Sequence, residues 1–355
     1  PITAVFTVRG CDHQCVTCGA SQAAFDRFMP GPHPLRRSPA AIAEAVQTLA
    51  ALTRAPIFLV GDLRDSGEPY ARAVVEALAR RPVDNRLVFE FFAPPPDEFL
   101  ARLEEALPHW GAEFSPESHA EAIRARLGKA QYPNARLEAA LAACLRRRCE
   151  QLDLFYMIGL PGQTSASVLE TVRAIEVLFQ RFDRRLSAFI TPLGPFIDPG
   201  SAGFETPAAH GYRLFARTLA EHRALLEAND WEAMLNYETE WMTRAQIVAV
   251  TYAAAEQLND LKERYGRISP QRAAAVRGRL QAARAIRSQL AAGGPADPET
   301  RRALAQAIQA FSEGTLNDKA ELFPPAVFWR NFRLGGIVRL LAQEALAVWR
   351  GGAGG

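Results

Sequence analysis

Three cysteines near the start of the sequence have the spacing of ligands to one metal centre. Cys11, Cys15 and Cys18 form the pattern C-x3-C-x2-C. They follow an apolar, β-branched run over residues 2–8, which indicates a buried strand. Closed zinc sites and ordinary iron–sulfur sites usually take four protein ligands. Three thiolates would leave one iron of a 4Fe–4S cluster open to a further ligand, so the pattern points to a reactive metal centre.

A zinc site is the main alternative, because His13 lies between the first two cysteines and completes a Cys3His set. The rival interpretation is therefore a non-catalytic zinc or iron–sulfur module on an α/β scaffold. The spacing opposes zinc, since His13 would share a short loop with two other ligands, whereas zinc sites usually pair ligands from separated elements. Cys144 and Cys149 are interpreted as ordinary buried thiols, and no second cluster is predicted.

The cysteine spacing, the strand before it and the missing fourth cysteine resemble the radical SAM superfamily. The resemblance implies an enzyme that holds a 4Fe–4S cluster on Cys11, Cys15 and Cys18. It also implies that the open iron binds S-adenosylmethionine (SAM), which is cleaved reductively to a 5′-deoxyadenosyl radical, with an electron donor such as flavodoxin or ferredoxin. Thr17 stands where this family usually has an aromatic residue, so the adenine would need another packing partner.

The elements that must position these residues read as a parallel α/β sheet, because short apolar runs alternate with helical patterns up to about residue 191. Six strands are expected, over residues 2–8, 57–60, 87–92, 110–114, 152–158 and 186–190. Helices are expected between them, over residues 38–52, 69–80, 97–107, 118–127, 134–148 and 164–182. Six β/α units predict a partial TIM-type (β/α)6 barrel, in which chemistry lies at the carboxyl ends of the strands.

We expect two domains, a partial-barrel core over residues 1–205 and a mainly helical C-terminal domain over residues 206–355. The loop over residues 19–37 is long, and we expect it to be structureless and functional. Helices are expected in the second domain over residues 207–227, 243–265, 270–290, 297–311 and 336–349.

The ends of the second and fourth expected strands carry candidate SAM-binding residues. Gly61 and Asp62 occupy the place where radical SAM proteins commonly have a Gly-Gly-Glu that receives the methionine ammonium. Glu117 and Ser118 resemble a Glu-Ser pair that many members use near the ribose and the carboxylate. Ser118 is also a possible helix N-cap, with Glu121 at capping-box spacing.

The end of the fifth expected strand carries the segment Gly-Leu-Pro-Gly-Gln-Thr. Its glycines let the backbone approach a flat ligand, and Thr164 is suited to cap the next helix. The segment resembles a loop of cobalamin-dependent radical SAM enzymes whose main chain meets the adenine, and the matching positions are Gly159, Leu160, Pro161 and Gly162.

Glu90 is a further candidate, because strand alternation places it with Val88 and Phe92 on one face, where a barrel has its cavity. Two later segments, residues 192–201 and 236–244, are rich in aromatic and hydrogen-bonding side chains. They are expected either to line the substrate pocket or to pack domains together.

The subgroup resemblance implies cobalamin, and with it methyl transfer or a radical rearrangement of a small-molecule substrate. The sequence contains no D-x-H-x-x-G cobalamin motif, and it begins at Pro1, almost on its first strand. Either a cobalamin-binding domain precedes this sequence in the native protein, which is the alternative we favour, or the protein works without cobalamin.

Bulk composition limits the remaining classes. The 355 residues are 48% hydrophobic and 23% charged, as in an ordinary globular protein. The net charge of +2 gives no support for a nucleic-acid partner, and the arginines between residues 272 and 302 read as a solvated helix face. No run reaches the ~18 apolar residues of a membrane helix. Five cysteines, three of them clustered, favour a reducing, cytoplasmic location.

Overall fold

The computed structural model describes residues 3–29, 31–32, 34–228, 230–291, 333–336, 338 and 341–342. The expected helix over residues 297–311 lies outside these ranges, as does most of the expected helix over residues 336–349. None of the described helices is long and apolar enough to cross a lipid bilayer.

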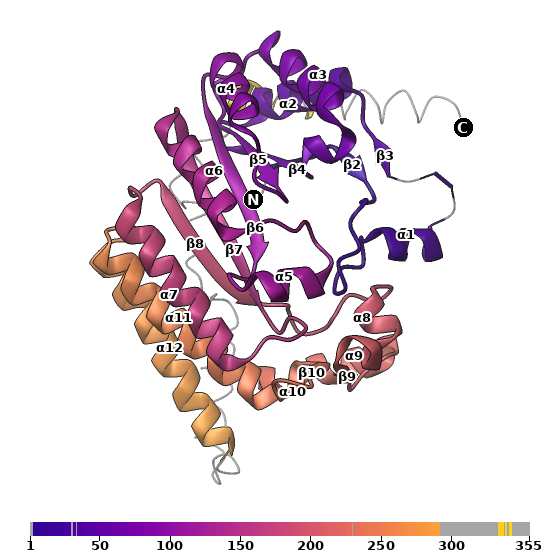
Figure 1. The fold of residues 1–355 in the computed structure, drawn as a ribbon, viewed down its shortest axis with the longest axis vertical. Helices are drawn as coiled ribbons and strands as arrows, with labels where there is room; N and C mark the ends of the chain where they lie inside the picture. Colours follow the sequence, from indigo (N-terminus) through magenta and orange to yellow (C-terminus); the bar gives the residue numbers. More distant parts are fainter. Residues whose placement is uncertain are drawn as a thin grey trace.

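The architecture is one six-stranded parallel sheet with helices along its outer face (Figure 1). The strands lie in chain order: β1 (Ala4–Phe6), β4 (Ile57–Val60), β5 (Leu87–Phe91), β6 (Trp110–Glu117), β7 (Cys149–Ile158) and β8 (Leu186–Pro192). The connections between successive strands contain the longer helices α2 (Pro39–Leu52), α3 (Glu68–Ala79), α4 (Asp97–Ala106), α6 (Asn134–Arg146) and α7 (Ser165–Arg181), besides the shorter α1 and α5 described below. The sheet is open between β1 and β8, which confirms a partial (β/α)6 barrel.

Alternation along the strands separates the core from the interior face of the barrel. Phe89, Phe114 and Leu154 point toward the helices and are at most 1% exposed. Burying each such side chain contributes roughly 1.5–3 kcal/mol. Their strand neighbours Glu90 and Glu113 face the other way and are half-buried. The core thus lies between sheet and helices, and the interior face keeps polar groups.

The helix starts follow the sequence signals closely. Ser38 caps α2 by accepting a hydrogen bond from the Ala41 amide at 3.2 Å, and Thr164 caps α7 in a reciprocal box with Ser167. Thr243 caps α11 (Arg244–Arg264) in the same manner, through Gln246. The cap predicted at Thr164 is confirmed, and the helices expected from residues 38 and 243 begin at capping residues.

The loop over residues 19–37, expected to be structureless, has structure of its own. It contains α1 (Gln22–Phe28) and a short strand, β3 (Leu35–Arg36), which pairs antiparallel with β2 (Val8–Arg9). That expectation was wrong, because the Ser21 side chain caps α1 and the β2–β3 pairing closes the loop on itself.

The region after β8 begins with irregular elements and then becomes helical. Its elements in chain order are α8 (Ala202–Glu205), the 3-10 helix η2 (Pro207–His210), β9 (Tyr212–Leu214), α9 (Leu219–Leu226), α10 (Trp231–Met234), β10 (Tyr237–Thr239), α11 and α12 (Pro270–Ala291). The helix expected over residues 207–227 was wrong in its first half, because β9 pairs antiparallel with β10. In Figure 1, α7, α11 and α12 lie side by side along one flank.

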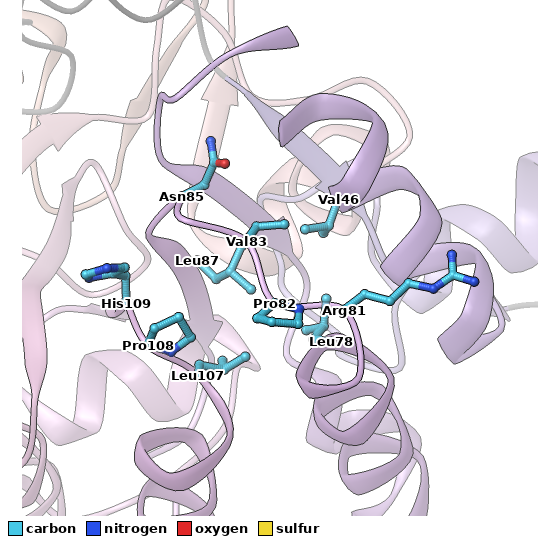
Figure 2. A pocket seen from close by; sticks show the side chains of 10 residues that line it. All are labelled: Val46, Leu78, Arg81, Pro82, Val83, Asn85, Leu87, Leu107, Pro108 and His109. Atoms are coloured by element: carbon cyan, nitrogen blue, oxygen red, sulfur yellow. The ribbon is translucent and has the colours of Figure 1, made fainter. Parts of the chain in front are cut away.

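A pocket lies at the amino-terminal edge of the sheet, beside the segments that lead into β5 and β6 (Figure 2). It is lined by Val46, Leu78, Arg81, Pro82, Val83, Asn85, Leu87, Leu107, Pro108 and His109. The segments before β5 and β6 contribute most of this lining. The pocket is therefore at the edge opposite to the loops in which a barrel of this type places its chemistry.

Candidate metal centre and active site

The three cysteines share one loop between β2 and α1, at the carboxyl edge of the sheet (Figure 1). All three thiols are half-buried. The amide of His13 donates to Cys11 Sγ and the amide of Ala20 donates to Cys18 Sγ, both at 3.4 Å. Backbone N–H groups directed at cysteine sulfur stabilise the thiolate form that binds iron. The loop backbone is thus arranged around sulfur ligands.

The electrostatics of the thiols show what metal binding must overcome. Burial raises the pKa of Cys15 to about 12, while the ammonium of Lys129 opposes the rise. Burial also raises the pKa of Cys11 and of Cys18, and the charge of Cys18 adds to the rise at both Cys11 and Cys15. A metal must therefore displace protons from three neighbouring, partly desolvated sulfurs. Three soft donors of this kind suit an iron–sulfur cluster.

His13 is engaged elsewhere than at the cysteines. Its Nε2 lies 2.9 Å from Asp65 Oδ2, and its ring meets the Phe92 ring edge-on with centroids 5.4 Å apart. Within the described ranges, no three His, Cys, Asp or Glu side chains are gathered as they would be around a single metal ion. In this conformation the His13 imidazole is paired with Asp65 rather than with a cysteine sulfur.

The loop that follows α5 (Glu121–Leu127) holds the cysteine loop from one side. The amide of Val16 donates to the Leu127 carbonyl at 2.8 Å. Gly128 then ends α5 in the left-handed region, at φ 81°. A Cβ at Gly128 would stand 2.5 Å from the Gln14 carbonyl oxygen, well inside van der Waals contact. Only glycine permits this approach, which fixes the backbone beside Cys15.

The segment after β8 holds the cysteine loop from the other side. The amide of Gly19 donates to Asp198 Oδ2 at 3.0 Å, and the amide of Gly203 donates to the Val16 carbonyl at 2.7 Å. Of the two roles expected for residues 192–201, the structure shows packing, and the packing is against the cysteine loop.

The end of β4 places Gly61 and Asp62 in different environments. Gly61 has φ 98°, and its amide donates to Glu90 Oε2 at 2.6 Å. Asp62 is 5% exposed; it pairs with Arg64 at 2.5 Å and accepts from the Phe92 amide at 3.1 Å. Burial raises the pKa of Asp62, and the guanidinium of Arg64 opposes the rise. The Asp62 carboxylate therefore fixes the turn after β4.

The end of β6 carries a buried ion pair. Glu117 adopts φ 63°, the only non-glycine residue at positive φ in the described chain. Its Oε1 accepts from the ammonium of Lys129, whereas its buried Oε2 has no hydrogen-bond partner among the described residues. Burial lowers the pKa of Lys129, but the Glu117 carboxylate outweighs burial and raises it overall. An unsatisfied buried oxygen here marks a position for a ligand donor.

Ser118 is fully buried beside this pair but does not cap α5. The N-cap is Ala120, and Glu121 accepts from the Asn134 amide at 2.8 Å. The capping box expected between Ser118 and Glu121 was wrong, because β6 continues through Glu117 and the helix begins later.

A row of acidic residues crosses the interior face of the sheet at one level. Glu90 of β5 pairs in register with Glu113 of β6, and Glu113 pairs with Asp153 of β7. Burial raises the pKa of Glu90. Burial, with the neighbouring charges of Glu90 and Asp153, raises the pKa of Glu113 to about 8. The interior position expected for Glu90 therefore extends to two further carboxyl groups, which the sequence analysis did not select although they have the same alternation.

The Gly-Leu-Pro-Gly loop after β7 is held by hydrogen bonds to side chains that pack behind it. The amides of Gly159 and Leu160 both donate to Gln163 Oε1, at 2.7 and 3.2 Å. The Tyr212 hydroxyl donates to the Gly159 carbonyl at 2.8 Å, and a Cβ at Gly159 would stand 2.8 Å from the Tyr237 hydroxyl. Two buried tyrosines from the paired strands β9 and β10 therefore support this loop. Tyr237 belongs to the segment 236–244 that the sequence analysis selected, whereas no local pattern in the sequence indicated Tyr212.

Pro161 and Gly162 complete this loop at its junction with α5. A Cβ at Gly162, whose φ is 81°, would meet the Arg126 side chain at 3.0 Å. Helix α5 therefore lies between the cysteine loop, which contacts its carboxyl end, and the loop after β7. The site residues selected from the sequence come from one edge of the sheet, and Lys129, Glu113 and Tyr212 are the additions that the structure makes.

Comparison with known proteins identifies the core. Residues 5–175 match the family model described as the radical SAM superfamily. This range contains β1 to β7, the cysteine loop and most of α7. A search of curated protein sequences gives no significant match.

Several solved structures match this chain, and the first of those named here reaches the level of a shared fold. The methyltransferase TsrM from Kitasatospora setae, with cobalamin and a [4Fe–4S] cluster bound, matches at 16% identity and a TM-score of 0.50, over 88% of this chain and 61% of that one. The same enzyme with tryptophan and a SAM analogue matches at 19% identity and a TM-score of 0.41, over 50% and 34%. Coproporphyrinogen III oxidase from Escherichia coli matches at 13% identity and a TM-score of 0.39, over 68% and 62%. This chain thus spans less than two thirds of each of these proteins.

Proposed function

Because its domain over residues 5–175 makes this chain a member of the radical SAM superfamily, we propose that it binds a 4Fe–4S cluster and cleaves SAM reductively. The observation that carries the proposal is the cysteine loop, whose three half-buried thiols lie at the carboxyl edge of the parallel sheet. When bound, such a cluster supplies the electron that splits the sulfonium of SAM into methionine and a 5′-deoxyadenosyl radical.

Cys11, Cys15 and Cys18 are the proposed iron ligands. Their number leaves one iron without a protein ligand. The amides of His13 and Ala20, which already donate to two of the sulfurs, would stabilise the negative charge of the bound thiolates.

The strand ends are the proposed contacts for SAM. Glu117 has a buried oxygen that meets no hydrogen-bond donor in the described part of the chain, and it therefore provides an acceptor for a hydroxyl or ammonium of the ligand. Gly61, Gly159 and Gly162 lie at positive φ, and we propose that the main chain at these strand ends meets the ligand. The position of a Cβ at each of them is filled by protein side chains, so glycine is needed for the local backbone. Asp62 and Ser118 are buried beside these groups, and we assign them the positioning of the backbone around the ligand.

We assign substrate binding to Glu90 and the interior face of the sheet. The Glu90 carboxylate accepts a hydrogen bond from the Gly61 amide at 2.6 Å, which connects the row of acidic residues to the end of β4. A substrate placed against this face would be covered by the sheet on one side, and the chain's role would be to hold it near the radical and exclude water.

For the reaction after SAM cleavage we propose methyl transfer or a radical rearrangement that depends on cobalamin. Supporting it are the GLPGQT segment after β7 and the fold shared with TsrM, a methyltransferase whose structure contains cobalamin. S-Adenosylhomocysteine formed only with added, reduced cobalamin would favour methyl transfer, because reduced cobalamin can accept the methyl group of SAM. Products that are the same with and without cobalamin would count against its involvement.

The central test is anaerobic reconstitution with iron and sulfide. We expect an iron–sulfur absorption band that dithionite bleaches, and an electron paramagnetic resonance (EPR) signal that changes when SAM is added. Cys15→Ala should lose the cluster. Cys144→Ala is the matched control, because Cys144 is a buried thiol on α6, outside the cysteine loop, and this variant should keep the cluster.

A zinc-loaded protein without the absorption band would overturn the proposal. A Cys15→Ala variant that binds as much iron as the wild type would refute the ligand assignment alone.

A further inference from the structure

Lys129 is a buried cation that the sequence analysis did not select. Its side chain is 11% exposed, and its ammonium binds Glu117 Oε1 and lies 4.8 Å from the centroid of the Phe92 ring. It follows Gly128, and a Cβ at Gly128 would be 3.8 Å from the Cys15 amide nitrogen. The lysine is thus attached to the point where the cysteine loop docks.

The residue type is unusual in this chain. Lys129, Lys262 and Lys319 are the only lysines among 41 Lys and Arg residues. Arginine has a planar guanidinium with a delocalised charge, whereas lysine carries a compact point charge on a slim stem. A compact ammonium suits the space between an aromatic ring and a buried carboxylate. The position therefore holds a concentrated positive charge where water is largely excluded.

This charge lies beside the sulfur ligands. The amide of Val16 donates to the Leu127 carbonyl at 2.8 Å, two residues before Lys129, and a Cβ at Gly128 would be 2.5 Å from the Gln14 carbonyl oxygen. The cysteine loop and the lysine belong to different elements, so their proximity reflects tertiary packing of the loop on the end of α5.

We propose that Lys129 is a positioning residue that sets the charge balance around the cysteine loop and so raises the reduction potential of a cluster bound there. The inference rests on the cluster binding proposed above. Reduction by one electron from an external low-potential donor adds a negative charge to a site that already holds three thiolates. A neighbouring buried cation stabilises that added charge, since electrostatic interactions are strong where water is excluded.

The Glu117 carboxylate makes the idea testable by charge balance. Lys129 and Glu117 together are neutral, so removing the lysine alone leaves an unpaired negative charge near the cluster. Removing both charges restores neutrality. An electrostatic role therefore predicts that the double variant returns toward the wild-type potential, whereas a purely structural role predicts that it deviates further.

The experiment is an EPR-monitored redox titration of the reconstituted full chain, without SAM. For Lys129→Met we expect the equilibrium constant for reduction to fall about tenfold, which lowers the midpoint of a one-electron couple by about 59 mV. Lys129→Met with Glu117→Gln should recover most of this shift, and Lys129→Arg should keep the wild-type midpoint. The control is Lys262→Met, which removes a second buried lysine that lies over the Phe189 ring, at 4.1 Å, on α11.

An unchanged midpoint in Lys129→Met, with full iron content, would overturn the inference and leave the proposed function intact. If Lys129→Met takes up no iron, the double variant decides: a wild-type midpoint there supports the inference, and a lowered one refutes it. A wild-type protein that binds no cluster would instead refute the proposed function.

Discussion

Replacing Gly128 by alanine is the most specific perturbation of the cysteine loop. The new Cβ would stand 2.5 Å from the Gln14 carbonyl oxygen, about 0.9 Å inside the 3.4 Å at which ordinary contact begins. Because the opposing atom is backbone, the Gln14–Cys15 peptide must move by a comparable distance. The left-handed conformation at φ 81° adds roughly 1–2 kcal/mol for any residue with a Cβ.

Gly266 provides the matched control. It follows α11 at φ 65°, and a Cβ there would meet nothing within 4 Å. Gly266→Ala should therefore show the backbone term alone, about 1–2 kcal/mol in the free energy of unfolding. Gly128→Ala should lose more than that, about 2–3 kcal/mol in all, because the contact with the cysteine loop is added.

The assay is urea unfolding of the metal-free variants, followed by iron analysis after anaerobic reconstitution. We expect Gly266→Ala to bind wild-type amounts of iron and Gly128→Ala to bind clearly less, because Cys15 is displaced. Equal unfolding free energies and equal iron contents in the two variants would refute the argument that Gly128 positions the ligand loop.

Three further predictions concern the surroundings of the site. Folding raises the pKa of the Glu113 carboxyl from 4.5 to about 8. Between these pH values the folded state retains a proton that the unfolded state has lost. The free energy of unfolding of the wild type should therefore fall as the pH rises from 4.5 to about 8. Glu113→Gln should remove this slope and gain roughly 1–3 kcal/mol at pH 7 in chemical unfolding; an unchanged slope would contradict the assignment. Tyr212→Phe removes the hydrogen bond to the Gly159 carbonyl and should cost about 1 kcal/mol while weakening SAM binding measured by calorimetry, and unaltered SAM affinity would count against support of this loop. Asp198→Ala removes the acceptor for the Gly19 amide and should speed iron loss to a chelator, whereas Asp198→Asn, which keeps an acceptor oxygen, should behave as wild type; equal loss rates would exclude this contact as a brace.

The strands and most helix starts were predictable because their signals are local. The β4 strand, Ile57–Val60, is a continuous apolar run that is covered by helices, and its predicted bounds are confirmed. Ser38 and Thr243 mark the starts of their helices, because their side chains accept hydrogen bonds from backbone amides of the first turn.

Errors arose where pairing between distant segments decides the structure. Residues 207–227 have helical periodicity, yet Tyr212–Leu214 pairs with Tyr237–Thr239, and Gly211 turns the chain into that hairpin at φ 72°. Ser118 resembles a helix cap in sequence, but β6 continues through Glu117 because it pairs with β7 there. Local propensity cannot report such contacts.

The same distinction holds for the site. The three cysteines lie within one loop, so their spacing alone indicated a metal centre. Lys129 and Gly128 lie more than a hundred residues after the cysteine loop that they contact. Tyr212 lies about fifty residues after the loop that it supports behind β7. None of the three belongs to a motif, and only the packing of α5 and of the β9–β10 strand pair brings them to the site.

The most direct test of the account is the fate of SAM on the reduced, reconstituted protein. With dithionite as reductant, the wild-type chain should convert SAM to methionine and 5′-deoxyadenosine, quantified by mass spectrometry, while Cys15→Ala should form neither above the rate without enzyme. Cluster-loaded wild-type protein that leaves SAM intact, or 5′-deoxyadenosine formed equally by Cys15→Ala, would contradict the assignment of the cysteine loop as the reactive centre.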